Sequence, residues 1–248
     1  MPRITLAAAW SLAVLAVAAW VAPASAANVN IDWLVMSPPA FGSVVPNASV
    51  YTVAGVGNVT VTYSIPVTTT HFRTQNVSYV VGNVVFGPNN YQWTNHEYFG
   101  SIFSGPDLGP EAFTITYTFP LQPAGSVYIG SIGLGATTSF GGGTSTTTVN
   151  QNGTFLGDYN GMAGFGATLF VGGAGTFTLQ NSVTGAGGVD PHWNSQLGVV
   201  RIDDAVSSVT VHQSGLRGDG IGVNIGFSPD LITPTETSTW GRVKQLYR

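Results

Sequence analysis

Acidic side chains are the first candidates for catalysis in this chain, because glycoside hydrolysis needs two carboxyl groups that face each other across a cleft. The chain has only three glutamates, Glu97, Glu111 and Glu236, and its eight aspartates are scattered among turns. Glu97 and Glu111 flank a loop and form the one pair that we consider for a groove. No Gly-x-Ser-x-Gly elbow, phosphate loop, dinucleotide fingerprint or His-Glu-x-x-His helix accompanies them. The sequence therefore predicts no catalytic residues.

Metal binding is the second chemistry to consider. Four aspartates lie close enough in the sequence to share one end of a sheet, where their oxygen atoms would suit Ca²⁺: Asp190, Asp203, Asp204 and Asp219. Their spacing matches no calcium loop, and the histidines show no metal-ligand spacing. Cysteine is absent, which excludes thiolate sites, thiol nucleophiles and disulfides. We expect no cofactor, with Ca²⁺ as the alternative.

Exposed aromatic side chains offer a third chemistry, since planar rings stack on sugars without any catalytic group. Tyr91, Trp93 and Tyr98 crowd an apparent loop. They predict a carbohydrate-binding platform. The alternative is that Trp93 and its neighbours fill the core at one end of the fold.

Charge is scarce in this chain. Only 7% of the residues are charged, and the formal net charge is −4. Nucleic acid is excluded as a partner, because phosphate contacts depend on clustered lysine and arginine. The 33 glycines, together with abundant Thr, Ser, Asn and Val, favour strands and turns over helices. We therefore expect a surface made polar by hydroxyls and amides.

These residues must be positioned by strands, because apolar and polar residues alternate with the two-residue period of a half-buried sheet. In Ala112 to Phe119, apolar side chains occupy one face and threonines the other, and Val59 to Ile65 repeats the pattern. About twelve such strands lie between residues 27 and 232, separated by Gly, Pro and Asn turns. Gly135 to Gly153 is either a long loop or a polar edge strand pair. The pattern predicts an all-β, two-sheet antiparallel sandwich that is jelly-roll-like.

The N-terminus is typical of a cleaved signal peptide. Arg3 precedes an apolar run that is densest from Leu12 to Val21, and the small-residue site Ala24-Ser25-Ala26 follows. The apolar run is shorter than a membrane-spanning helix requires. We expect residues 1–26 to be removed, and the mature chain to be exported and to have no transmembrane helix.

The C-terminus, residues 233–248, breaks the strand pattern and carries three of the six basic residues outside the predicted signal peptide. We interpret it as a linker followed by a tail that is either frayed or serves sorting or docking. The predicted tail residues are Trp240, Gly241, Arg242, Lys244, Tyr247 and Arg248.

Three stretches near the C-terminus, Trp193 to Asp203, Val206 to Val211 and Gly218 to Gly226, resemble the last strands of exported bacterial β-sandwich surface proteins of the PEP-CTERM type. The resemblance covers about 35 residues. The Val-Pro-Glu-Pro motif, apolar helix and arginine cluster of that family are missing. The ending instead looks like short Trp-Gly-x-x-Lys-x-x-Tyr-Arg tails on secreted proteins of other environmental bacteria. The resemblance implies delivery to the cell surface or extracellular matrix.

Together these features predict a non-enzymatic secreted or cell-surface protein that serves structure or adhesion. Its expected partners are extracellular polysaccharide or other surface proteins. Two alternatives stay open: a carbohydrate-binding module that uses Tyr91, Trp93 and Tyr98, and a polysaccharide-acting hydrolase that uses Glu97 and Glu111.

Overall fold

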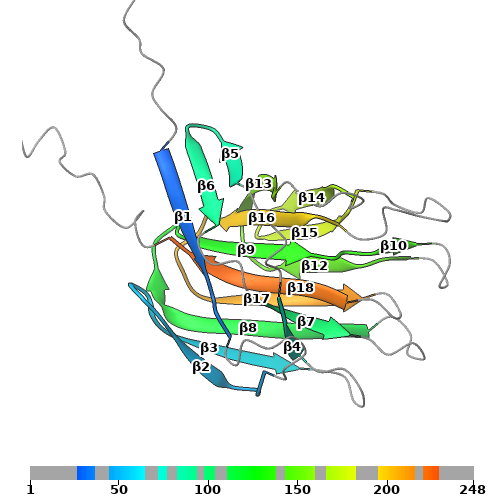
Figure 1. Cartoon of the computed structure of the whole chain (residues 1–248), viewed down its shortest axis with the longest axis horizontal. Coiled ribbons are helices and arrows are strands. Elements are labelled where there is room, and N and C mark those ends of the chain that lie inside the picture. Colours follow the sequence, from blue (N-terminus) through cyan, green and yellow to red (C-terminus); the bar gives the residue numbers. More distant parts are fainter. Residues whose placement is uncertain are drawn as a thin grey trace, which may run out of the picture.

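The fold is known from a computed structural model, shown in Figure 1. It describes residues 27–36, 45–64, 72–76, 83–93, 98–103, 111–137, 143–159, 166–182, 195–215 and 220–228. Every regular element in these residues is a strand, and the strands form two large sheets and one small hairpin. The predicted all-β, two-sheet sandwich is confirmed. Within the same residues, no helix has the length and apolar character needed to span a membrane.

The first sheet has seven strands in the order β14-β15-β12-β17-β8-β3-β2, and every neighbouring pair is antiparallel. Its strands are β2 (Ser49–Val53), β3 (Gly57–Ser64), β8 (Glu111–Gln122), β12 (Thr146–Val149), β14 (Thr168–Gly173), β15 (Thr176–Asn181) and β17 (Val206–Gly215). The longest strands, β8 and β17, lie side by side near its middle.

The second sheet has nine strands, with the main order β13-β16-β9-β18-β1-β6-β5; β7 also pairs with β18, and β4 pairs with β7. Its strands are β1 (Ala27–Trp33), β4 (Phe72–Asn76), β5 (Asn83–Phe86), β6 (Asn89–Trp93), β7 (Tyr98–Phe103), β9 (Val127–Ile132), β13 (Gly153–Tyr159), β16 (Leu197–Ile202) and β18 (Gly220–Phe227). β1 and β6 pair in parallel, unlike the antiparallel pairing predicted. The chain between them supplies the long crossover that a parallel pair requires.

The described residues contain eighteen strands, more than the twelve or so expected. The strands without a predicted counterpart are β4, β6, β10 (Ala136–Thr137), β11 (Gly143–Thr144), β12 and β13. Three of them lie within Gly135 to Gly153, which was interpreted as a loop or an edge pair. β12 is instead an interior strand, paired with β15 on one side and β17 on the other.

The main core lies between the two sheets, as the alternation predicted. Ile115, Tyr117 and Val211 of the seven-stranded sheet are fully buried against Ile129 and its neighbours in the other sheet. Burying such side chains fully contributes about 1.5–3 kcal/mol each. This burial fixes which face of each strand points outward.

A second core covers the outer face of the nine-stranded sheet. Figure 1 shows β1, β6 and β5 at a steep angle to β9, β16 and β18. Buried side chains fill the space there, including Trp33 of β1, Tyr91 of β6, and Tyr128 and Leu197 of the sheet. All six residues of β9 are buried for this reason. Among the described residues, the outer face of the seven-stranded sheet has no such covering layer.

A buried polar chain joins the two sheets. Gln213 Nε2 of β17 donates to Thr147 Oγ1 of β12 at 3.1 Å, and the Thr147 and Ser131 hydroxyls lie 2.7 Å apart. Ser131 of β9 also donates to the Gly222 carbonyl at 3.3 Å. These contacts satisfy polar groups that would otherwise be costly to bury. They explain how the threonine-rich β12 can be an interior strand of its sheet, with Thr147 buried.

Candidate functional site

The outer face of the seven-stranded sheet carries hydroxyl side chains in rows that cross the strands. In each row, residues on neighbouring strands are direct partners in the antiparallel register. The first row is Thr60, Thr118 and Ser208; the second is Thr62, Thr116 and Thr210; the third is Ser64, Thr114, His212, Thr148 and Thr178. We call these eleven residues the hydroxyl face.

The hydroxyl face follows directly from the alternation in the strands. In β8, Thr114 and Thr116 are half-buried and point outward, while Ile115 between them is fully buried in the core. Every residue of the face is half-buried or exposed, and none is Asp, Glu, Lys or Arg. Directly opposite residues in such a pair have Cβ atoms about 4.5–5.5 Å apart. The surface is therefore a dense, neutral array of hydroxyl groups.

Neighbouring hydroxyls in these rows bond to one another. The Oγ1 atoms of Thr116 and Thr210 lie 3.1 Å apart, and those of Thr148 and Thr178 lie 2.9 Å apart. A hydroxyl has one donor and two acceptor sites, so one bond within a pair uses one donor and one acceptor. Each pair keeps one O–H group and three acceptor sites. The face can both donate and accept hydrogen bonds.

His212 is the one ring in the array, and threonine and asparagine hold it on both sides. Its Nδ1 lies 3.1 Å from Thr114 Oγ1, and its Nε2 lies 3.2 Å from Asn150 Nδ2. Because an asparagine Nδ2 only donates, the second contact makes Nε2 the acceptor and Nδ1–H the donor to Thr114. These contacts fix the orientation of the imidazole on the sheet.

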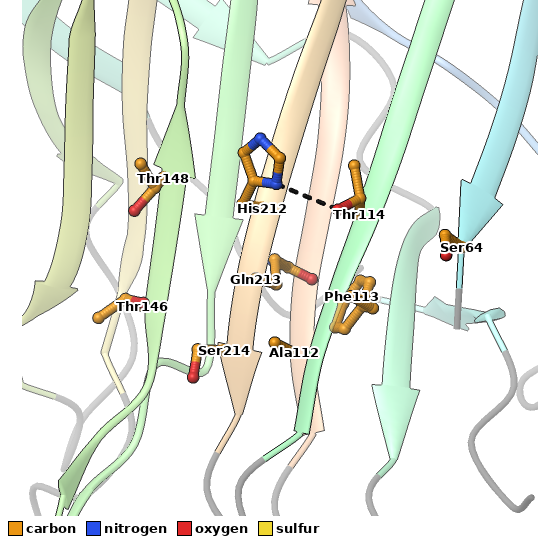
Figure 2. A pocket seen from close by; sticks show the side chains of 9 residues that line it. All are labelled: Ser64, Ala112, Phe113, Thr114, Thr146, Thr148, His212, Gln213 and Ser214. Atoms are coloured by element: carbon orange, nitrogen blue, oxygen red, sulfur yellow. Dashed lines mark hydrogen bonds between the residues drawn. The ribbon is translucent and has the colours of Figure 1, made fainter. Parts of the chain in front are cut away.

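A hollow of about 510 Å³ lies at one end of the hydroxyl face, and Figure 2 shows the side chains that line it. It is lined by side chains from β3, β8, β12 and β17: Ser64, Ala112, Phe113, Thr114, Thr146, Thr148, His212, Gln213 and Ser214. Gln213 is only 1% exposed. Its Nε2 bonds to Thr147, but its Oε1 is buried and has no hydrogen-bond partner among the described residues. An unpaired buried acceptor costs about 1–3 kcal/mol.

Comparison with known protein families, curated proteins and solved structures finds no match to this chain. The resemblance to PEP-CTERM surface proteins stays a prediction.

The predicted aromatic platform does not form as expected. Tyr91 is 1% exposed, and its ring packs edge-to-face against Tyr128 with ring centroids 6.0 Å apart. It cannot stack on a sugar, and burial in the second core is the alternative that the sequence left open. Trp93 lies at the end of β6 and not in the apparent loop, and Tyr98 is the first residue of β7, which matches the strand predicted from Tyr98 to Phe103.

The predicted aspartates are separate structural groups as far as the structure describes them. The Asp203 Oδ1 atom forms an ion pair with Arg201 at 2.9 Å, and its Oδ2 accepts from Thr154 at 2.7 Å. Asp204 Oδ2 accepts from the backbone N–H and the side chain of Asn152 at 3.1 and 2.9 Å. No cluster of three or more His, Cys, Asp or Glu suited to a metal occurs in the described part of the chain.

Several predicted residues lie outside the described residues. They are Asp190, Asp219, Glu97, the signal peptide (residues 1–26) and the tail residues Trp240, Gly241, Arg242, Lys244, Tyr247 and Arg248. Glu111 is the first residue of β8. The proposed pair of Glu97 and Glu111 is thus not placed, and the predictions for the two ends of the chain stay predictions.

Proposed function

We propose that this chain is a non-enzymatic, secreted or cell-surface protein that serves structure or adhesion, and that it adheres through the hydroxyl face. The observation that carries the proposal is the alignment of neutral hydroxyls in rows across the open face of one sheet. The predicted signal peptide and C-terminal tail support an extracellular location. A second candidate, an aromatic carbohydrate-binding platform, loses support because Tyr91 is buried.

The chemistry of the face suits weak, repeated contacts. A hydrogen bond to a ligand replaces one to water, so each contributes only about 0.5–1.5 kcal/mol. Rows of equivalent groups gain strength by acting together, because every later contact forms at a high effective concentration. A face without charges is also little affected by salt screening. We expect adhesion that depends on many contacts and persists at high ionic strength.

The location is tested by fractionating cells that express the full chain or a version ending at Pro234. We expect the full chain outside the cytoplasm, cleaved after residue 26, and the shortened version to be distributed differently. Full-length protein that stays uncleaved in the cytoplasm would contradict the proposal. Identical distributions would remove the role of the tail alone.

The face is tested by measuring how the secreted protein adheres to the extracellular matrix of the producing cells. Thr116→Val together with Thr210→Val removes two paired hydroxyls while keeping the branched shape that suits a strand. Thr52→Val is the matched control, because Thr52 is an exposed threonine of the edge strand β2 that pairs with Asn58 and lies outside the three rows. We expect adhesion to fall in the double variant, to be kept in the control and to resist added salt. Adhesion that salt abolishes would contradict the proposal.

A further inference from the structure

We infer that the hydroxyl face binds a neutral polysaccharide, and that the hollow beside His212 is its main subsite. The inference rests on the proposed adhesion function and names the ligand of that surface. Three features of the described residues support it: the hydrogen-bonding capacity of the face, the composition of the hollow and the shape of the sheet.

The hydrogen-bonding capacity of the face matches a polyhydroxylated ligand. The pair of Thr116 and Thr210 keeps one O–H donor and several acceptor sites after its internal bond. A sugar hydroxyl also donates once and accepts twice, so it meets complementary groups wherever it lies on the rows. A carboxylate, sulfate or phosphate only accepts, and no lysine or arginine stands on the face to balance its charge. A neutral polymer fits this surface better than an anionic one.

The hollow offers both kinds of contact that a sugar ring uses. Its volume of about 510 Å³ lies in the range of small-ligand sites. Thr114, Thr148 and Ser214 supply hydroxyls, and the exposed imidazole of His212 supplies a flat ring against which C–H groups can pack. Gln213, which also lines the hollow, has an Oε1 acceptor without a partner among the described residues. That oxygen is buried on the inner side of the sheet, where Gln213 bonds to Thr147, so the hydroxyls on the outer side make the contacts with a ligand.

The shape of the sheet favours a flexible chain over a flat solid such as ice. Adjacent strands in a sheet are generally rotated by about 20–25°, so the face of a seven-stranded sheet is expected to be twisted and not flat. A rigid crystal plane would touch only a few strands at once. A polysaccharide chain follows the twist and reaches the third row along five strands, from Ser64 to Thr178.

Affinity electrophoresis of the secreted protein tests the inference. Native gels would contain dextran, galactomannan or mixed-linkage β-glucan as neutral probes, and alginate as an anionic one. We expect at least one neutral polysaccharide to retard the protein, and alginate to have no effect. His212→Ala, and Thr114→Val with Thr148→Val, should each weaken the binding about tenfold, since each removes contacts in the hollow. Thr52→Val should bind like the parent, and circular dichroism checks that every variant is folded.

Three results would overturn the inference: no retardation by any neutral probe, equal retardation of parent and hollow variants, or stronger binding to alginate. Inhibition of ice recrystallisation without retardation would assign the face to ice instead. Matrix adhesion that needs Thr116 and Thr210, in a protein that no polysaccharide retards, would refute this inference and leave the proposed function standing. A parent protein that neither binds a neutral polysaccharide nor adheres to the matrix would refute this inference and the proposed function.

Discussion

Replacing Gly130 by alanine is expected to destabilise the fold, because Trp33 already occupies the space above this glycine. Gly130 lies in β9, and the indole of Trp33 in β1 packs over it as part of the second core. A Cβ atom added to Gly130 would lie 2.7 Å from Trp33 Cη2 and 3.2 Å from Leu197 Cδ1. Carbon atoms prefer separations of about 3.5–4.0 Å. The ring would therefore have to move by about 1 Å.

The ring of Trp33 has little room for that movement. It is 3% exposed, and it also lies over Gly226, where an added Cβ would meet its Cε3 at 3.0 Å. Overpacking of this kind costs about 1–3 kcal/mol, and the confinement of the ring places Gly130→Ala in the upper part of that range. Alanine restricts the unfolded chain more than glycine, which offsets about 0.4–1 kcal/mol. The expected net loss is about 1–2 kcal/mol of unfolding free energy.

Urea unfolding of the purified protein, followed by circular dichroism, measures this loss as a lower midpoint at an unchanged slope. Gly173→Ala is the matched control, since an added Cβ there meets its nearest atom at 3.6 Å, an ordinary contact. Trp33→Phe removes the part of the ring that collides. A double-mutant cycle should then show coupling of about 1 kcal/mol. A Gly130→Ala protein as stable as the parent, or strictly additive effects with Trp33→Phe, would refute the reasoning.

Three further outcomes are expected. Asn152→Ala should lower the unfolding free energy by about 1–2 kcal/mol, measured by thermal unfolding, because it removes the side-chain bond from Asn152 Nδ2 to Asp204 and the bond that Asn152 Oδ1 accepts from the Gly175 N–H; Gln151→Ala is its control. Burial raises the pKa of Asp158 above its ordinary value of 3.8, despite opposing hydrogen bonds from Thr168. The parent should therefore lose stability as pH rises through that raised pKa, and Asp158→Asn should not, when urea midpoints are compared at roughly pH 3 and pH 7. Tyr117→Phe should raise the urea midpoint, since the buried Tyr117 hydroxyl has no partner among the described residues; a lower midpoint would contradict this account.

The sequence predicted the strands whose burial depends on apolar side chains. β8 is the clearest, because Phe113, Ile115 and Tyr117 alternate with threonines and are buried as expected. β12 was missed because Thr147 is buried through hydrogen bonds to Ser131 and Gln213, which leave no apolar period in the sequence. A hydropathy pattern detects strands that are buried through apolar side chains, and it misses strands whose polar side chains are buried through hydrogen bonds.

The candidate site was visible in the sequence only as separate pieces. The threonines of β3 and β8 were correctly assigned to one face of each strand. Their assembly into rows depends on which strands are neighbours, and Thr116 meets Thr210 across 94 residues of sequence. Tyr91 was misjudged because Asn89 and Asn90 beside it favour turns, whereas in the fold they pair with β1 and β5. Repeated Thr-x-Thr motifs in several strands are the signal that would have indicated the face.

The attachment of β1 has a consequence for how the chain reaches its native state. Leu34, just beyond β1, accepts a hydrogen bond at 2.8 Å from the buried Asn224 of β18, 190 residues later in the sequence. On any route that delivers the chain from its N-terminus onward, β1 can pair with β6 early, but its other neighbour, β18, becomes available almost last. Contacts this distant in sequence also slow folding. The contacts that join the two ends of the described chain therefore form only when nearly all of it is available.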